Sequence, residues 1–355
     1  KQIWVLCANI WNGKGGIYKV DTNYKISNFN AEYKIPEYGF TEIVEDLDGN
    51  IIFGGTLGLF IFDGKVIDHF RYGDGLSSGI VTDIYVDKNN NYWLGTTSGL
   101  SFYDGKSFQN YGNRDGLGGA SSIKKIGKSP KGDLYVSTGW GWNTFSGHQL
   151  FSYDGVVFSP VEYTRFHSQI NDFLFENEKL IYNTGNRMVI ADKRSQQTIS
   201  PLGSLNKSIP LNVLSIFKNN EGVIFVTTWG SGTFSYNDKN LRTFTDLDGH
   251  KSRFGLQTAV YDNDNNLWLS RQDGLSKTKN ESIVKVFTLS NGLPSGIVND
   301  LCLDDFGNIW GATENGIFSI NNDKVISYKD KFDPSFMNFN KIDISKSGII
   351  WAMGK

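Results

Sequence analysis

A period of a little over forty residues runs through this sequence and constrains its fold more than any other feature. Two stretches align almost without gaps: SGIVTDIYVDKNNNYWLGTTSGLSFYDGKSF from Ser78, and SGIVNDLCLDDFGNIWGATENGIFSINNDKV from Ser295. One column of the repeat is always large and apolar, with members 41 to 48 residues apart. These members are Trp4, Ile52, Trp93, Tyr135, Ile181, Phe225, Trp268, Trp310 and Trp351. A period of this length without a helical pattern predicts propeller blades.

Each period contains the signals of four strands, which we name A, B, C and D. The runs IVTDIYVD and NYWLGTT, separated by the polar residues 88–91, predict an antiparallel hairpin. Two further strands surround Asp104-Gly105, which we expect to be a two-residue turn because Gly tolerates a positive φ. Four-stranded sheets with two apolar faces cover one another when they are stacked radially. The sequence therefore predicts an all-β fold, a β-propeller of four-stranded antiparallel blades.

The strand count leaves two closures open. The chain begins in a B strand (1–8) and ends after another (348–354), which gives nine B strands but eight A, C and D strands. If the last A strand (339–345) completes the first blade, the eight repeats form eight blades with one surplus strand; otherwise the ring has seven. No linker composition divides residues 1–355, so we expect a single propeller. Both ends fall within a motif, and we expect a longer protein.

Composition excludes several classes of protein. The 355 residues carry a formal net charge of -2, whereas a nucleic-acid partner needs a basic excess. No apolar run reaches the roughly 18 residues of a membrane-spanning helix, so we expect no direct membrane insertion. The two cysteines, Cys7 and Cys302, are too few for a disulfide scaffold, and we expect free buried thiols.

The repeat also carries a family signature. GLSSGIVTDIYVDKNNNYWLGTTSGLSFYDG (Gly75 to Gly105), echoed from Gly292 to Phe318, resembles the two-component regulator propeller repeat. The resemblance covers nearly the whole chain and fades in the fifth repeat, where NRMVIADKRSQQ replaces the expected G-L-x-x-Y-D-G. It implies a periplasmic or cell-surface sensor region of a Bacteroidetes hybrid two-component system that responds to glycans. Similar repeats occur in a surface propeller protein of type IX secretion.

Residues that break the repeat are the candidates for function. Five of the nine tryptophans lie in the strand B column, where periodic aromatic residues indicate packing between blades. The other four all lie in B to C connections, hence on one face: Trp11, Trp140, Trp142 and Trp229. Trp140 and Trp142 belong to the longest connection (139–149) and either cover their own loop or form a stacking platform.

Polar side chains share this predicted face. Those that we select as ligand-binding candidates beside the four tryptophans are His148, Arg187, Arg271 and Glu314. Other polar residues of the same connections, and of the D to A connections, are Asn12, Lys14, Asn143, Arg165, His167, His250, Arg253 and Asp273. Aromatic platforms ringed by amides and arginines suit oligosaccharides, including acidic ones, because guanidinium pairs with carboxylate or sulfate.

Four motifs that suggest a functional site have plainer structural explanations. DLDGN at Asp46 and DNDNN at Asp262 begin like a calcium loop but lack its glutamate and flanking helices, so they predict A to B turns. DDFGNIW at Asp304 is similar to the aspartate-box hairpin, itself a structural turn. NGKGG at Asn12 lacks the ending of a phosphate loop and predicts a flexible connection. We therefore expect no metal and no cofactor.

Catalytic signals are sparse. The sequence contains no HExxH, GxSxG or SxxK motif, and His69 falls in a D strand where we expect a structural role. A polysaccharide lyase stays open, with a histidine or tyrosine base and arginines that neutralise a uronate. Its candidate residues are His148, His167, Tyr163, Arg165 and Arg253.

Three classes of function therefore compete. We favour a glycan-sensing propeller of a two-component ectodomain over an interaction scaffold of a type IX secretion surface complex, and either over a lyase. The expected partners are an oligosaccharide, possible further domains of the same longer chain and, left open, a second copy in a dimer. An enzyme is the less favoured reading because no acid-base cluster is evident in the sequence.

Overall fold

The structure of this chain is a computed structural model. It describes residues 3–7, 16–20, 26–36, 39–118, 122–139, 150–164, 170, 172–184, 187–199, 212–218, 223–229, 233–237, 240–244, 258–271, 273–279, 282–332, 337–344 and 350–354. The chain divides into two compact units. Unit 1 contains residues 1–40 and 217–355, and unit 2 contains residues 41–216.

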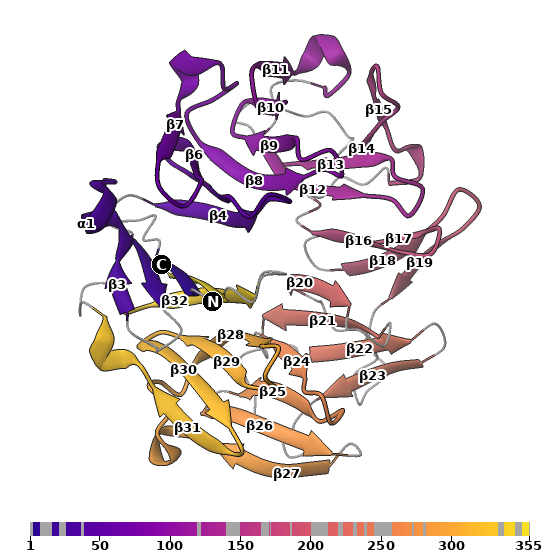
Figure 1. Cartoon of the computed structure of the whole chain (residues 1–355). Coiled ribbons are helices and arrows are strands. Elements are labelled where there is room, and N and C mark those ends of the chain that lie inside the picture. The colour runs from indigo at the N-terminus through magenta and orange to yellow at the C-terminus, as the bar shows by residue number, and fades with distance from the viewer. Residues whose placement is uncertain are drawn as a thin grey trace. The chain divides into compact units, whose positions relative to one another are not determined.

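Unit 2 consists of four sheets, each an antiparallel meander of four consecutive strands (Figure 1). The first is β4 (Phe40–Glu45), β5 (Ile51–Gly55), β6 (Gly58–Phe62) and β7 (Ile67–Phe70). The second is β8 (Val81–Val86), β9 (Tyr92–Thr96), β10 (Gly99–Tyr103) and β11 (Phe108–Tyr111). The third is β12 (Ile123–Lys128), β13 (Leu134–Thr138), β14 (Leu150–Tyr153) and β15 (Phe158–Pro160). The fourth is β16 (Phe173–Glu176), β17 (Lys179–Thr184), β18 (Arg187–Ala191) and β19 (Gln196–Ile199).

Unit 1 contains three sheets of the same kind and one of five strands. The first is β20 (Asn212–Lys218), β21 (Ile224–Trp229), β22 (Thr233–Asn237) and β23 (Asn240–Phe244). The second is β24 (Ala259–Tyr261), β25 (Leu267–Arg271), β26 (Gly274–Lys279) and β27 (Ser282–Phe287). The third is β28 (Val298–Leu303), β29 (Ile309–Thr313), β30 (Gly316–Asn321) and β31 (Lys324–Ser327). Strand β20 contains the boundary between the units.

The five-stranded sheet joins the two ends of the described chain. Its order is β3 (Ile26–Asn28), β2 (Gly16–Val20), β1 (Ile3–Cys7), β33 (Ile350–Gly354), β32 (Phe339–Ile344). Strands β1 and β33, both B strands of the repeat, pair in parallel with Leu6 opposite Met353. The last A strand, β32, and the first B strand, β1, thus belong to one sheet.

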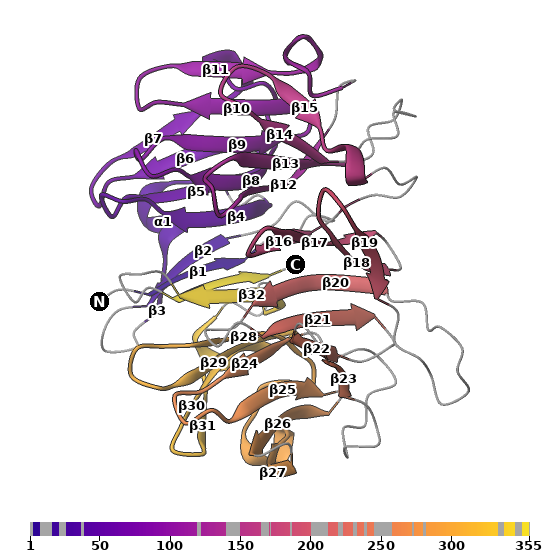
Figure 2. The ribbon, with the colours of Figure 1, turned by 90° about the vertical axis from the view of Figure 1, so that its right-hand side faces the viewer.

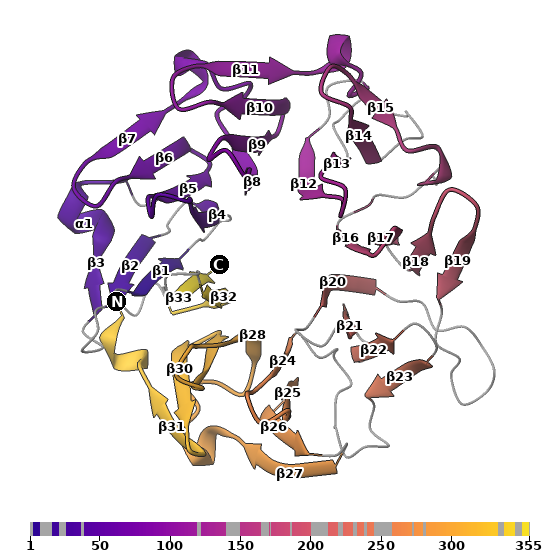
Figure 3. The same cartoon turned by 45° about the vertical axis from the view of Figure 1, so that its right-hand side comes forward.

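Within each unit the first strands of successive sheets are neighbours. In unit 2 the first strands of the four sheets lie on one side of the unit, and the fourth strands lie on the opposite side (Figure 3). The first strands are β4, β8, β12 and β16. Figure 2 shows the same sheets from the side. The short helices η1 (Tyr72–Asp74), η2 (Asn113–Asp115), η3 (Glu162–Thr164), η5 (Leu289–Asn291) and η6 (Lys329–Lys331) each follow a fourth strand, and α1 (Phe29–Tyr33) follows β3.

These sheets confirm the predicted all-β fold with four-stranded antiparallel blades of the β-propeller class. The described residues form eight sheets, four in each unit if the sheet begun by β20 is counted with unit 1. A closed ring of eight blades, or of seven, is not confirmed by these two units. The single domain over residues 1–355 stays a prediction. No helix among the described residues is long and apolar enough to cross a membrane.

The predicted turns recur, with one correction. The turn at Asp104-Gly105 is not a two-residue loop, because Tyr103 pairs with Phe108 and residues 104–107 form the connection. Oδ1 of Asp104 accepts hydrogen bonds from the backbone N–H groups of Lys106 and Ser107, at 2.9 and 2.7 Å. This side-chain cap stabilises a longer loop than the dipeptide rule assumes, and the positive φ of Gly105 (87°) is used inside it.

The strand B column is the packing column that the sequence predicts. Its members with described side chains in β5, β9, β17, β21, β25 and β29 are buried, and Tyr135 is half-buried. The side chains of Trp4 and Trp351 lie outside the described residues. Trp310 stacks on Tyr328 with ring centroids 5.4 Å apart, and Trp268 stacks on Phe287 at 5.3 Å. Cys302 is buried, as predicted, whereas the side chain of Cys7 is not described.

Aspartates of two A strands, Asp83 and Asp300, link their sheets to the next. Oδ2 of Asp83 in β8 accepts a hydrogen bond from the backbone N–H of Ile126 in β12, at 2.6 Å. Oδ1 of Asp83 also pairs with Nζ of Lys125 at 3.2 Å. In unit 1, Oδ2 of Asp300 accepts from the backbone N–H of Ile342 at 3.0 Å. Each carboxylate therefore holds the first strand of the following sheet.

Carboxyls in two of the A to B turns have pKa values below their usual range. Burial raises the pKa of the Asp46 and Asp262 carboxyls, but hydrogen bonds outweigh burial and hold both pKa values below their usual range. The donors are Tyr92, Asn50 and Asn90 for Asp46, and Asn266 and Trp268 for Asp262.

We expect the stability of the chain to fall as the pH drops below about 4. A depressed pKa in the folded state gives a contribution that is present above the unfolded value of about 3.9 and is lost as the pH falls through the folded value. Urea midpoints measured across this range check the expectation. Asp262→Asn should lose less stability on acidification than the native chain, and an equal loss would show that Asp262 does not contribute.

Candidate functional site

Most of the predicted aromatic face lies outside the described residues. Trp11, Trp140, Trp142 and His148 belong to this group, as do Asn12, Lys14, Asn143, Arg165, His167, His250 and Arg253. Trp229 is the last residue of β21, immediately before a B to C connection, and Arg187 is the first residue of β18, immediately after one. Their side chains, and that of Tyr163 in η3, are not described. The aromatic face stays a prediction.

Arg271 and Glu314 are the two predicted site residues with described side chains, and both lie in unit 1. Arg271 ends β25, and its guanidinium pairs with the carboxylate of Asp273 through Nε at 2.8 Å and Nη2 at 3.3 Å. The Arg271 side chain is only 8% exposed, whereas that of Asp273 is 56% exposed. The pair therefore presents its carboxylate to solvent more than its guanidinium.

The connection before β28 lies against the two turns that carry these residues. Nδ2 of Asn315, next to Glu314, donates to the carbonyl of Pro294 at 3.1 Å. A Cβ built on Gly296 would lie 3.5 Å from Cα of Asp273. The structure thus brings residues 294–296 beside both turns, with Glu314 exposed at the edge of this surface.

His69 has the structural role that its place in a D strand predicts. Its ring stacks on Phe60 with centroids 3.9 Å apart, and Nε2 lies 2.8 Å from the carbonyl oxygen of Leu57. The A to B turns likewise use their carboxylates internally: Oδ2 of Asp304 accepts from the indole N–H of Trp310 at 2.9 Å. No group of three His, Cys, Asp or Glu residues is placed to hold a metal ion within the described part of the chain.

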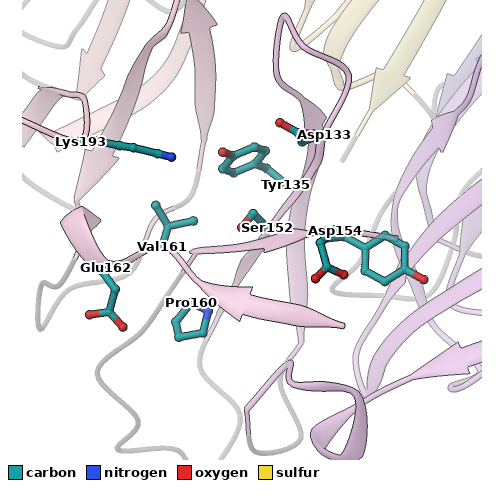
Figure 4. A pocket seen from close by; sticks show the side chains of 9 residues that line it. Asp133, Tyr135, Ser152, Asp154, Pro160, Val161, Glu162 and Lys193 are labelled. Atoms are coloured by element: carbon teal, nitrogen blue, oxygen red, sulfur yellow. The ribbon is translucent and has the colours of Figure 1, made fainter. Parts of the chain in front are cut away.

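Unit 2 contains a pocket that the sequence analysis did not identify. It has a volume of about 500 Å³ and lies between the sheet β12–β15 and the sheet β16–β19 (Figure 4). The residues that line it are Asp133, Tyr135, Ser152, Tyr153, Asp154, Pro160, Val161, Glu162 and Lys193. Figure 4 shows the Lys193 side chain extending from the second sheet toward the ring of Tyr135.

The charged groups of the pocket are three carboxylates and one ammonium. Oδ1 of Asp154 accepts from the backbone N–H groups of Val156 and Val157, at 2.8 and 2.9 Å, and these bonds lower the pKa of the carboxyl. Oδ2 of Asp133 accepts from the Ser129 hydroxyl at 3.2 Å. With Glu162 and Lys193, the rim carries a net charge of about -2 at neutral pH.

A signal for this pocket exists in the sequence. The fifth repeat departs from its template at NRMVIADKRSQQ, where Ala191 and Lys193 take the places of the expected Tyr and Gly. Lys193 lines the pocket. The missing aromatic residue can be seen in the sequence of this repeat. It indicates a cavity only when the register between neighbouring sheets is known.

The repeated sheets, with capped turns and a buried B column, define a repeat protein of the β-propeller class. Residues 75–98 match the family model described as "Two component regulator propeller", which confirms the resemblance seen in the sequence. No curated protein matches the chain significantly.

Solved structures with similar folds come from different functional classes. The extracellular domain of a hybrid two-component system from B. thetaiotaomicron is 18% identical, with a TM-score of 0.51; the match covers 99% of this chain and 53% of that one. A virginiamycin B lyase from Staphylococcus aureus has 12% identity and a TM-score of 0.54, covering 88% and 96%. The computationally designed protein Ika8 has 11% identity and a TM-score of 0.59, covering 89% and 96%. At these identities the likeness shows the fold alone, and the chain spans about half the length of the first structure.

Proposed function

We propose that this chain is a ligand-recognising propeller segment of an extracellular bacterial sensor, and that its ligand is an oligosaccharide. The match of residues 75–98 to the two-component regulator propeller carries the proposal. The fold likeness to an extracellular domain of such a system agrees with it and supports a periplasmic or cell-surface location. Signalling to other domains of a longer chain is part of the same proposal.

The ligand-binding face that we propose is the one formed by the B to C connections. In the described part of this face, residues 294–296 lie against both the Asp273 turn and the Asn315 turn, which brings connections of neighbouring sheets together. Rigid sheets with short polar connections can hold a rigid binding surface at low entropic cost. Trp11, Trp140, Trp142 and Trp229 supply the stacking rings in this proposal.

A binding screen tests the proposed face. Oligosaccharides are titrated into the chain and followed by tryptophan fluorescence and calorimetry, and the titrations are repeated on Trp140→Ala, Trp142→Ala and Trp229→Ala. We expect at least one of these changes to weaken binding about tenfold or more, the typical cost of removing an aromatic anchor. Binding that survives all three changes would contradict the proposed face.

The same samples distinguish a sensor from an enzyme. We expect no turnover, so uronate polymers incubated with the chain should develop no ultraviolet absorbance from an unsaturated product. If the absorbance appears and His148→Ala or His167→Ala abolishes it, the chain is a lyase and that histidine is its catalytic base.

A further inference from the structure

The packing around Trp93 shows how aromatic rings fill the space between two sheets of unit 2. The indole of Trp93 contacts three aromatic rings: Phe102 at 4.7 Å and Tyr111 at 5.6 Å within its own sheet, and Tyr153 of the next sheet at 5.5 Å. Phe102 is directly opposite Trp93 in the antiparallel register. Tyr111 is opposite Leu100, and Tyr153 is opposite Leu134.

The next sheet has no ring at these three positions, although Phe175 of β16 contacts Tyr135 with ring centroids 4.7 Å apart. Tyr135 takes the place of Trp93, and Ser152 is directly opposite it. Val161, whose N–H donates to the carbonyl of Leu150 at 2.9 Å, takes the place of Tyr111. Ala191, opposite Leu180 in the following sheet, takes the place of Tyr153.

The pocket of about 500 Å³ lies where these rings are missing. Tyr135, Ser152 and Val161 all line it. Two sheets of unit 1 retain a ring at the fourth-strand position, since Trp268 stacks on Phe287 and Trp310 on Tyr328. The volume falls in the range of about 300–1,000 Å³ that small-molecule sites occupy.

We propose that this pocket is a saccharide site, in which a pyranose ring takes the place of the missing aromatic rings. The proposal deepens the proposed recognition function but uses a different surface from the B to C face. Tyr135 offers a ring to the apolar face of a sugar, and Pro160 and Val161 supply further apolar contact. Hydroxyl groups of the sugar donate to the carboxylates of the rim, and Lys193 donates to a sugar oxygen.

The charge of the rim selects among sugars. Asp133, Asp154 and Glu162 outnumber Lys193, so a carboxylate or sulfate group on the ligand would meet net repulsion. An amino group would be attracted. The site is therefore specific for uncharged or amino-substituted sugars and excludes uronates, in contrast to an arginine-lined site.

The test uses the full chain with cellobiose, glucosamine and glucuronic acid as probes, by calorimetry and saturation-transfer NMR. We expect cellobiose and glucosamine to bind and glucuronic acid to bind at least about tenfold more weakly. Absence of binding by both favoured probes at about 10 mM overturns the proposal. Equal or tighter binding of glucuronic acid overturns the charge argument and with it the assignment.

Filling the pocket gives the decisive variants. Ser152→Phe and Val161→Tyr restore rings that the preceding sheet has at the same register, so we expect both to keep or raise the thermal midpoint and to weaken binding about tenfold or more. Ser282→Phe, at an exposed strand position of unit 1 outside the pocket lining, is the matched control and should bind as the native chain does. If one filling variant fails to fold, the other carries the test.

Affinity that stays within twofold of native in a folded pocket-filling variant overturns the pocket site. Trp229→Ala separates this result from the proposed face. Binding lost in Trp229→Ala but kept in Ser152→Phe supports the face and rejects the pocket. The reverse pattern supports the pocket and rejects Trp229 as an anchor for these probes.

Discussion

Replacing Trp310 by Ala should destabilise the chain by about 3–5 kcal/mol, the range typical of a large aromatic residue removed from a core. Trp310 is only 1% exposed and stacks on Tyr328. Its indole N–H donates to Asp304, so the change also removes a hydrogen bond from the A to B turn. Chemical denaturation followed by circular dichroism measures the loss.

Phe306→Ala is the matched control for this experiment. Phe306 lies in the same A to B turn but is 76% exposed, and surface substitutions usually change stability by less than about 0.5 kcal/mol. If the two variants lose similar stability, the B column is not the packing column of the fold. A Trp310→Ala loss below about 1 kcal/mol would lead to the same conclusion.

Asp83→Ala should cost about 3 kcal/mol, because it removes two interactions of one buried carboxylate. The backbone N–H of Ile126 would lose its acceptor and Lys125 its closest carboxylate. The Asp83 side chain is 4% exposed, whereas that of Lys125 is 42% exposed, so solvent partly compensates the lysine but not the amide. Urea unfolding of the variant gives the value.

Asp83→Asn separates the two contributions. An asparagine oxygen can still accept from Ile126, so this variant should retain more stability than Asp83→Ala and lose mainly the ion pair with Lys125. Equal losses in both variants would assign the stabilisation to charge and not to the link between sheets.

The fold was predictable because its signal is periodic. Each B strand places one large residue in the packing between sheets, so the same signal recurs along the chain. Trp93, Trp268 and Trp310, all buried, occupy this position in three different repeats. The hairpin around Asp104 was predicted as a turn but with too short a loop, because the side-chain cap that lengthens it is not visible in a dipeptide preference.

The candidate site was predictable only in part, since ligand sites arise where the repeat is broken and each break occurs once. Arg271 was predicted to bind an acidic ligand, yet its guanidinium is paired with the carboxylate of Asp273, two residues further along the chain. A spacing of two residues fits this local ion pair as well as it fits two side chains that both face solvent. The pocket beside Tyr135 is lined by Ser152 of β14 and by Val161, which follows β15, and Ala191 of β18 stands where a tyrosine is expected. Their coincidence is a property of register between sheets, which a linear pattern does not contain.

The carboxylates of Asp83 and Asp300 bear on how such a chain can grow by gene duplication. Each accepts from a main-chain amide of the following sheet, Ile126 or Ile342. Every newly copied repeat brings that amide with it whatever its side chains are, so the copy can dock without compensating mutations in its neighbour. Side chains elsewhere in the copy are then free to diverge, and new specificities can accumulate one repeat at a time.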